Sequence, residues 1–370
     1  MSDRFPPVPS RCLPAAGSGA AVLGPSRRAM LRRGAEVLLA LGVTPLLTAC
    51  AGGGGGADVP ALPERSAPLR RDHPLAGRLW LTADRREISA ADLARRLFAA
   101  RWCLLGETHD NPDHHRLQAW CLSMLADAAR RAGRPAPGVV WEMIDETQAP
   151  ALTAALTAVA AGQLDAAGFG AALGWDQTGW PDWAIYQPVA AVALPAGLPM
   201  RAGGLSKGTT RRIAREGLAA VWTPAELEAL ALTSPLPEAA TEGQTAELKT
   251  GHCGLMPEAM LAPMLAIQTA KDAVMAQALR QGAAQAGGQG VLIAGSGHAR
   301  RDLGVPLHLL RQGDTGACLV VTGIEVQEGG TDPTAYELAD PSRADVVWFT
   351  GAAERDDPCE GLKARTGGKG

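Results

Sequence analysis

The side chains best placed for chemistry follow a short apolar run at residues 101–105. Glu107 and His109 come directly after this run, and Pro112 then fits the first turn of a helix, where a missing N–H has no cost. Apolar residues continue at helical spacing from Leu117 to Ala128. Because the 101–105 run is short and apolar enough for a buried strand, Glu107 and His109 should lie at a strand's carboxyl end, where open α/β sheets bind ligands.

Two further apolar runs end in the same way. Residues 290–294 lead through Gly295, Ser296 and Gly297 to His298, and residues 139–141 lead to Glu142. Parallel strands deliver their carboxyl ends to one edge, so we predict that Glu107, His109, Glu142 and His298 face one pocket and could bind a divalent metal ion. In the alternative interpretation, each side chain only caps a helix or satisfies a loop.

Two other groups of residues also allow two interpretations each. His252, Cys253 and Met256 lie in a turn-rich loop and could bind a soft metal, or the loop could simply start a helix beside a buried cysteine. A cluster of tryptophans could form the floor of a flat apolar ligand site or could pack a core; its members are Trp175, Trp180 and Trp183.

The first fifty residues are predicted to be a targeting segment. Residues 26–32 resemble the twin-arginine export motif, and residues 34–49 form an apolar stretch too short for a typical membrane span. The stretch ends in Leu-Thr-Ala followed by Cys50, which resembles a bacterial lipobox. We therefore expect a signal peptide over 1–49, and lipidation of Cys50 followed by a flexible tether, together residues 50–75.

Charge and cysteine usage limit the function classes. The chain carries −3, and residues 1–49 contribute +4 (six arginines against Asp3 and Glu36), so the mature part carries −3 − (+4) = −7. This balance argues against a nucleic-acid partner. The seven cysteines include Cys12 and Cys50 near the N-terminus and do not indicate a disulfide framework. Three others lie in apolar runs typical of small core residues: Cys103, Cys121 and Cys318.

The mature chain is predicted to be an α/β protein with a mostly parallel sheet flanked by helices. Strand-like runs occur near residues 103, 140, 200, 292, 320 and 347, one helix is expected within 175–194, and a long helix over 257–281. We predict one domain over 76–355, with a smaller inserted helical subdomain at about 146–195 and 206–285. Residues 60–74 should be an unstructured lead-in and 356–370 a disordered tail.

Taken in order, several motifs resemble the ChaN-like haem-binding uptake proteins of the wider Tiki/TraB and erythromycin-esterase superfamily. The resemblance spans about residues 90–312 and has one mild departure, Lys271 in place of the usual arginine. Its motifs are residues 106–109 (GETH), 114–118 (HHRLQ), 141–143 (WEM) with Gln148, 251–257 (GHCGLMP), 268–276 (QTAKDAVMA), 295–298 (GSGH) and 304–306 (GVP).

The resemblance implies a lipid-anchored envelope protein that binds haem and takes part in iron acquisition, and it favours a binding protein over an enzyme. Tyrosine is the implied iron ligand, which makes Tyr186 the first candidate, with His252 and His298 as rivals. The implied partners are haem, a second copy of the chain and an outer-membrane haem receptor, and Ala51 after the anchor favours the outer membrane by analogy. The alternative function is a metal-dependent hydrolase in which Glu107 or Glu142 acts as general base.

Overall fold

The computed structural model describes residues 59–357 and 359–361 of the chain. The predicted signal peptide, the predicted lipidation site at Cys50 and residues 51–58 of the predicted tether lie outside this range. Among the described helices, none combines the length and apolar character that crossing a bilayer would need.

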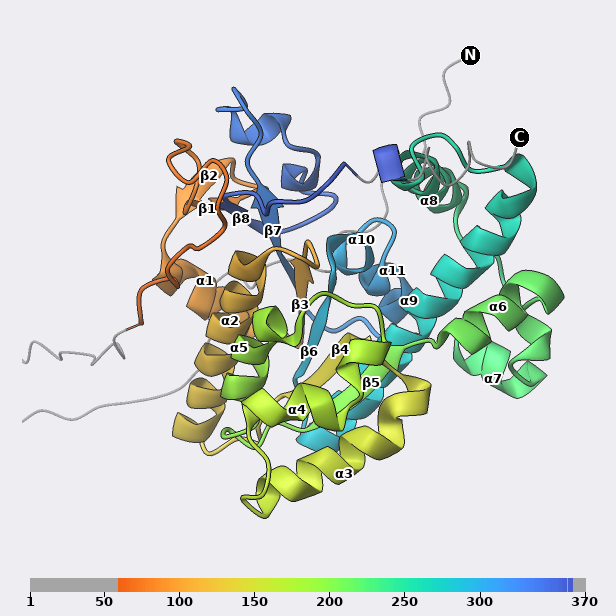
Figure 1. The fold of residues 1–370 in the computed structure, drawn as a ribbon, viewed down its shortest axis with the longest axis horizontal. Helices are drawn as coiled ribbons and strands as arrows, with labels where there is room; N and C mark the ends of the chain where they lie inside the picture. The colour runs from red at the N-terminus through yellow and green to blue at the C-terminus, as the bar shows by residue number, and fades with distance from the viewer. Residues whose placement is uncertain (1–58, 358, 362–370) are drawn as a thin grey trace, which may run out of the picture.

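A single mixed sheet of eight strands organises the described residues (Figure 1). Six neighbouring strands are parallel and two short edge strands are antiparallel. This arrangement confirms the predicted fold class, and all six predicted strands are present. In spatial order the strands are β2 (Arg86–Ile88), β1 (Leu79–Leu81), β8 (Val346–Thr350), β7 (Cys318–Glu325), β3 (Trp102–Glu107), β6 (Gly290–Gly295), β4 (Gly138–Asp145) and β5 (Met200–Gly204).

Helices cover both faces of this sheet, which explains why its strands are continuously apolar. Successive residues of a strand point to opposite faces, so Leu105 joins one hydrophobic core and Leu104 the other. The first core is closed by α1 (Ala90–Ala99), α2 (Pro112–Arg131), α3 (Ala149–Ala160), α4 (Ala166–Ala172) and α5 (Trp183–Ala193). The second is closed mainly by α9 (Glu258–Ala286) and α11 (Val305–Arg311).

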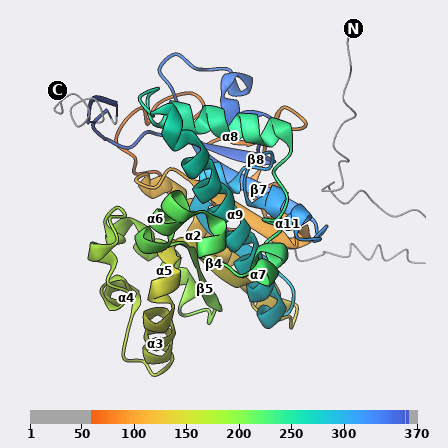
Figure 2. The ribbon, with the colours of Figure 1, turned by 90° about the vertical axis from the view of Figure 1, so that its right-hand side faces the viewer.

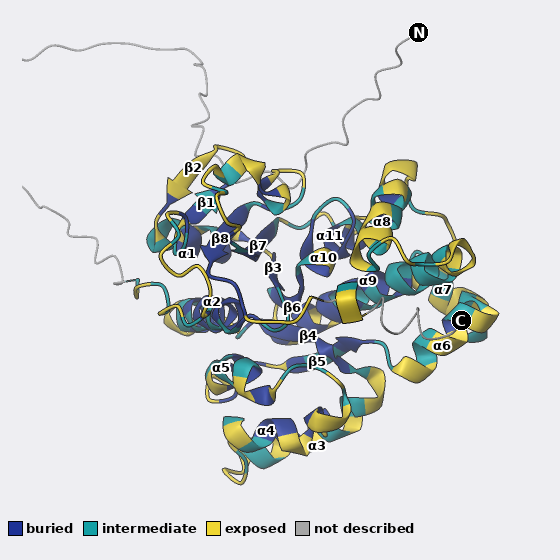
Figure 3. Cartoon of the chain, turned by 45° about the horizontal axis from the view of Figure 1, so that its top comes forward, coloured by how far each residue is buried: buried dark blue, intermediate teal, exposed yellow. Residues whose placement is uncertain are grey.

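The helix-rich region between residues 146 and 285 is divided between these two faces. Helices α3, α4 and α5 pack in the first core, whereas α6 (Lys207–Glu216) and α8 (Glu238–Gly251) pack on α9, together with the short α7 (Pro224–Ala229) nearby (Figure 2). Figure 3 shows the outer surfaces of these helices exposed and the strands buried. The helices therefore sandwich the sheet and leave its carboxyl edge between them.

Local sequence explains where the main helices begin and end. Asn111 caps α2 by accepting a hydrogen bond from the Asp113 amide, with Pro112 in the first turn as predicted. The long predicted helix is α9, which ends at Gly287 in a left-handed conformation (φ 86°). The helix expected within 175–194 is shorter than predicted, because Gly179 (φ 87°) and Pro181 separate a 3₁₀ turn at Trp175–Gln177 from α5.

The cysteines follow the predictions in part. Cys103 and Cys121 are buried core residues with free thiols, as expected, and Cys318 is a half-buried residue of β7. However, Cys253 is disulfide-bonded to Cys359, 106 residues away, which the sequence did not predict. The bond corrects the metal-ligand hypothesis for Cys253, because a disulfide sulfur is no thiolate. Cys359 lies within the predicted tail, where the described residues 359–361 are helical.

Candidate functional site

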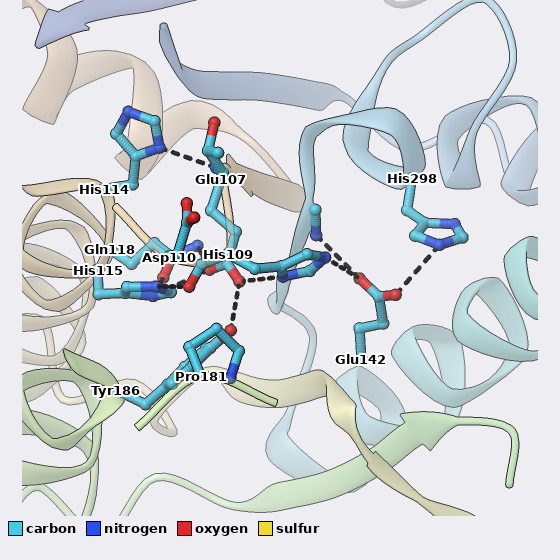
Figure 4. Close-up of polar contacts among 12 residues, drawn as sticks. Glu107, His109, Asp110, His114, His115, Gln118, Glu142, Pro181, Tyr186 and His298 are labelled. Carbon is cyan, nitrogen blue, oxygen red and sulfur yellow. Dashed lines mark hydrogen bonds and ion pairs between the residues drawn. The ribbon is translucent and has the colours of Figure 1, made fainter. Parts of the chain in front are cut away.

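Three neighbouring strands bring the predicted site residues together. β3, β6 and β4 lie side by side in the sheet, and their carboxyl ends meet at one edge. Glu107 ends β3, Glu142 lies in the last half of β4, and His298 belongs to α10 (Ser296–Ala299), which directly follows β6. With His109, these side chains form a continuous row of polar contacts (Figure 4).

Glu107 is buried at one end of this row and accepts hydrogen bonds from several elements. Its Oε1 lies 2.8 Å from His109 Nδ1 and 3.3 Å from the Tyr186 hydroxyl. Its Oε2 lies 2.6 Å from Gln118 Nε2 and 3.1 Å from His115 Nδ1. The carboxylate thus joins α2, α5 and the loop after β3.

The charge state of Glu107 follows from these neighbours. Burial alone would raise its pKa, but the nearby imidazoles of His115 and His109 lower the pKa to about 2. The same contacts raise the pKa of both histidines, although burial acts in the opposite direction. Glu107 is therefore an ionised carboxylate held between two imidazole rings.

Glu142 lies between His109 and His298 in the row. Its Oε2 accepts a 2.9 Å hydrogen bond from the Gly295 amide, and its Oε1 lies 3.1 Å from His298 Nε2 and 3.7 Å from Lys271 Nζ. The other ring nitrogen of His298, Nδ1, lies 2.6 Å from Asp272 Oδ1. His298 is therefore enclosed between two buried carboxylates.

This enclosure fixes the protonation of His298. Burial would lower its pKa, but the carboxylates of Glu142 and Asp272 raise the pKa to about 10. Both ring nitrogens then carry protons that are donated to carboxylate oxygens. The pKa of Glu142 is correspondingly held well below its usual range, again against the effect of burial.

His109 links Glu107 to Glu142, and its side chain is more exposed than either carboxylate. Its Nε2 lies 4.0 Å from Glu142 Oε2, and its ring lies against Trp180 with centroids 4.7 Å apart. A side chain at Gly295 would bring a Cβ to 2.8 Å from His109 Nε2, so glycine is required for this approach. His109 retains 33% side-chain exposure, against 0% for Glu107.

A pocket of about 600 Å³ opens beside this row. Glu142, Lys271 and Trp180 line it from the site, and Lys207 closes another side, where its Nζ donates to the Thr178 carbonyl at 2.9 Å. The tryptophan cluster is therefore divided. Trp175 and Trp183 are buried in the first core, whereas Trp180 is half-buried and available to a ligand.

The geometry does not support the predicted metal site. Within residues 59–357 and 359–361, no group of three or more His, Cys, Asp or Glu side chains is arranged to hold a metal ion. The physical reason is that these groups satisfy one another: His298 has no free lone pair, and Glu107 and Glu142 are already ion-paired. The same ion pairs occupy the carboxylate oxygens of Glu107 and Glu142, the two residues assigned the general-base role in the hydrolase alternative.

The three candidate haem ligands differ in what they offer to iron. Tyr186 is fully buried against Trp175 and His115, and its hydroxyl donates to Glu107. Burial and the Glu107 charge raise the pKa of Tyr186, so this conformation holds a neutral, enclosed phenol rather than an accessible tyrosinate. His298 is likewise enclosed. His252 is half-buried in the turn between α8 and α9 and does not join the row.

Sequence reasoning assigned no role to several residues of this network. Asp272 is the clearest omission, because it lies fully buried on α9 among Ala270, Ala273 and Ala276. A carboxylate on an otherwise apolar helix face requires a buried partner, which was the available signal. His115 and Gln118 lacked such a signal, because one turn of α2 carries polar residues on all sides.

Comparisons with known proteins agree with this fold. Residues 93–309, more than half of the chain, match the family model for haem-binding uptake proteins of the Tiki superfamily, ChaN. No curated protein matches the sequence. Among solved structures, one described as cofacial haem binding to ChaN of Campylobacter jejuni is similar, with a TM-score of 0.58 and 21% identity, covering 76% of this chain and 98% of that one.

More distant similarities extend beyond these proteins. The type III effector HopBA1 has a TM-score of 0.38 with 12% identity, covering 71% of this chain and 93% of its own. A mutant of the erythromycin esterase EreC in its open conformation has a TM-score of 0.37 with 12% identity, covering 76% of this chain and 99% of its own. The likeness to the Campylobacter protein shows a shared fold, and nothing is inferred from the other two.

Proposed function

This chain belongs to the ChaN family of haem-binding uptake proteins in the Tiki superfamily, and from this premise we propose that it is a membrane-anchored haem-binding lipoprotein of haem and iron uptake. The family match carries the proposal, because it spans both the network at the sheet edge and the α8–α9 turn. The implied haem receptor of the outer membrane would be its partner in uptake.

Haem titration tests the binding function. The protein beginning at Ala51 contains every described element and is titrated with ferric haem at neutral pH. We expect a saturable Soret shift that is absent when the same haem is added to buffer. If no saturable shift appears with folded protein, the haem-binding proposal is wrong.

A homodimer that sandwiches the ligand is the second element of the proposal. It is supported by the description of the Campylobacter relative as a cofacial haem complex. Light scattering with and without haem measures the assembly, and we expect the molar mass to double on haem addition. A monomer that stays monomeric at saturating haem contradicts the sandwich but leaves haem binding intact.

The lipid anchor is proposed from the sequence before residue 59 alone. Substituting Cys50→Ala should leave the precursor uncleaved and release the protein from membrane fractions. A matched change at another early cysteine, Cys12→Ala, should leave both properties unchanged. If the Cys50→Ala protein is still processed and still fractionates with membranes, the anchor assignment is wrong; outer-membrane location is tested by fractionating the two membranes.

A further inference from the structure

Residues 238–269 form an arm that is only lightly packed on the rest of the protein. This α8–α9 arm comprises α8, the turn that follows it and the first part of α9. Within the arm only Ala240 and Gln244 are buried, whereas the buried residues of α9 begin at Ala270. A segment with so few buried side chains should open at a lower free energy than the sheet and its two cores.

The arm covers one end of the row of polar contacts at the sheet edge. Gln268 Nε2 on the arm lies 3.2 Å from His298 Nδ1. Glu247 on the arm forms an ion pair with Arg300, two residues after His298 in the chain. A cavity of about 220 Å³ lies between these arm residues and Gly297 on α10. The position of the arm therefore determines how open the cavity beside His298 is.

The tip of the arm is fastened covalently to the last described segment of the chain. Cys253, in the turn after α8, is disulfide-bonded to Cys359, and that last segment lies next to α8 in Figure 1. The same segment is held at the sheet edge by Arg355, whose guanidinium donates to Asp110 and Glu325 at distances between 2.6 and 2.7 Å. The disulfide therefore connects the tip of the arm, through Arg355, to the edge of the sheet.

Two features of this disulfide favour exchange with an external thiol. Both of its cysteines are half-buried, whereas the free thiols of Cys103 and Cys121 are fully buried in the core. Cys253 also has a left-handed backbone conformation, with φ of 57°, which a non-glycine residue adopts only at a cost. Breaking the bond would let the turn leave this conformation. Exposed or strained disulfides are the labile ones, because reduction relieves the strain and a thiolate can reach the sulfur.

We propose that the Cys253–Cys359 disulfide is a redox-controlled clasp, reduced by a dithiol, that keeps the α8–α9 arm closed over His298. One thiolate of the dithiol attacks a sulfur of the disulfide, and the second thiol resolves the mixed disulfide that results. Two electrons and two protons pass to Cys253 and Cys359, which become thiols, while the dithiol becomes a disulfide. The reverse exchange with an oxidised dithiol closes the clasp. This inference goes beyond the proposed function and does not depend on haem binding.

Thiol labelling of the native protein tests whether the clasp opens without unfolding. The protein beginning at Ala51 is treated with dithiothreitol at neutral pH without denaturant, alkylated, and analysed by peptide mass spectrometry. We expect Cys253 and Cys359 to be labelled well before Cys103 and Cys121, whose burial makes their labelling a measure of global unfolding. If all four cysteines are labelled at the same rate, or if Cys253 and Cys359 resist labelling, the bond is a permanent structural link and the proposal is wrong.

Hydrogen–deuterium exchange of the oxidised and reduced protein tests what the clasp controls. Reduction should speed amide exchange over residues 248–260 by about tenfold or more, because the left-handed turn is no longer held, and should leave β3 and β6 unchanged. Cys359→Ser should show the reduced pattern without dithiothreitol, and the control Cys318→Ser should respond to dithiothreitol as the wild type does.

Circular dichroism checks that each variant is folded, and the reduced wild type gives the same comparison if Cys359→Ser is not. Arm exchange that is unchanged by reduction, or that rises equally in β3 and β6, would overturn the proposal.

Discussion

Removing His298 should be among the most damaging single changes in the site. Its ring separates two buried carboxylates, Glu142 at 3.1 Å and Asp272 at 2.6 Å. In His298→Ala, Glu142 keeps the Gly295 amide and Lys271, but Asp272 keeps only a 3.5 Å contact from Gln244. Leaving one member of a buried ion pair without its partner costs about 3–5 kcal/mol, so we expect a loss of that order in the free energy of unfolding at neutral pH.

The pH dependence identifies the cause of that loss. The pKa of His298 is about 10 in the folded protein and about 6.5 when unfolded, so its stabilising contribution is complete below about pH 6.5 and is lost as the pH rises towards 10. Urea unfolding curves of the wild type and His298→Ala are measured from pH 6 to pH 10. The difference between the two proteins should be largest near pH 6 and should shrink towards pH 10.

A matched control is available within the chain. His308 is also fully buried, but neither of its ring nitrogens has a hydrogen-bond partner, and burial lowers its pKa to about 3. His308→Ala should therefore create a cavity of similar size with a cost that is constant from about pH 8 to pH 10, well above both its folded and its unfolded pKa. A deficit in His298→Ala that is below about 1 kcal/mol, or that is as constant between pH 8 and pH 10 as that of His308→Ala, would refute the ion-pair reasoning.

Three further outcomes follow from the site geometry. The pKa of Glu107 is about 2, below its ordinary value, so its contribution to stability is present above about pH 4 and should be lost as the pH falls towards 2, measured by acid unfolding of the wild type against Glu107→Gln. Gly295→Ala should displace the His109 ring, which its Cβ would approach to 2.8 Å, at a cost of about 1–3 kcal/mol, visible in the ring's NMR shifts and in urea unfolding. Tyr186→Phe should cost no more than about 1.5 kcal/mol in unfolding free energy, because the ring keeps its packing and the lost hydrogen bond is long at 3.3 Å; a larger loss would show that the hydroxyl matters more than its geometry indicates.

The parallel part of the sheet could be predicted because strands buried on both faces appear in the sequence as continuous apolar runs. Residues 290–294 and 102–105 are apolar throughout, and each run lies in a strand at the centre of the sheet. The antiparallel strands β1 and β2 were missed, because each has only three residues, which is too short for a period-two pattern to be recognised.

The site was predictable to the extent that topology alone determines it. Strand ends place Glu107, Glu142 and His298 at one edge whatever their partners are. Partners contributed by helices depend on packing between elements distant in sequence, so the sequence could indicate that Asp272 on α9 needs a buried partner but not that this partner is His298. The same limit applies to the exposure of Tyr186: its helix was expected, but the sequence does not state which side of a helix faces the core when most of its residues are apolar.

The disulfide between Cys253 and Cys359 also determines how the protein would respond to proteolysis. The surface segment 327–335, which follows β7, lies between the two cysteines in sequence and contains mostly exposed residues. A protease that cuts once in this segment would create two polypeptides that remain covalently joined. Electrophoresis without reductant would show one band of unchanged mass, and only reduction would separate the fragments. A cleaved population could therefore persist undetected wherever the disulfide stays oxidised, with α8, α9 and the C-terminal segment still held in one molecule.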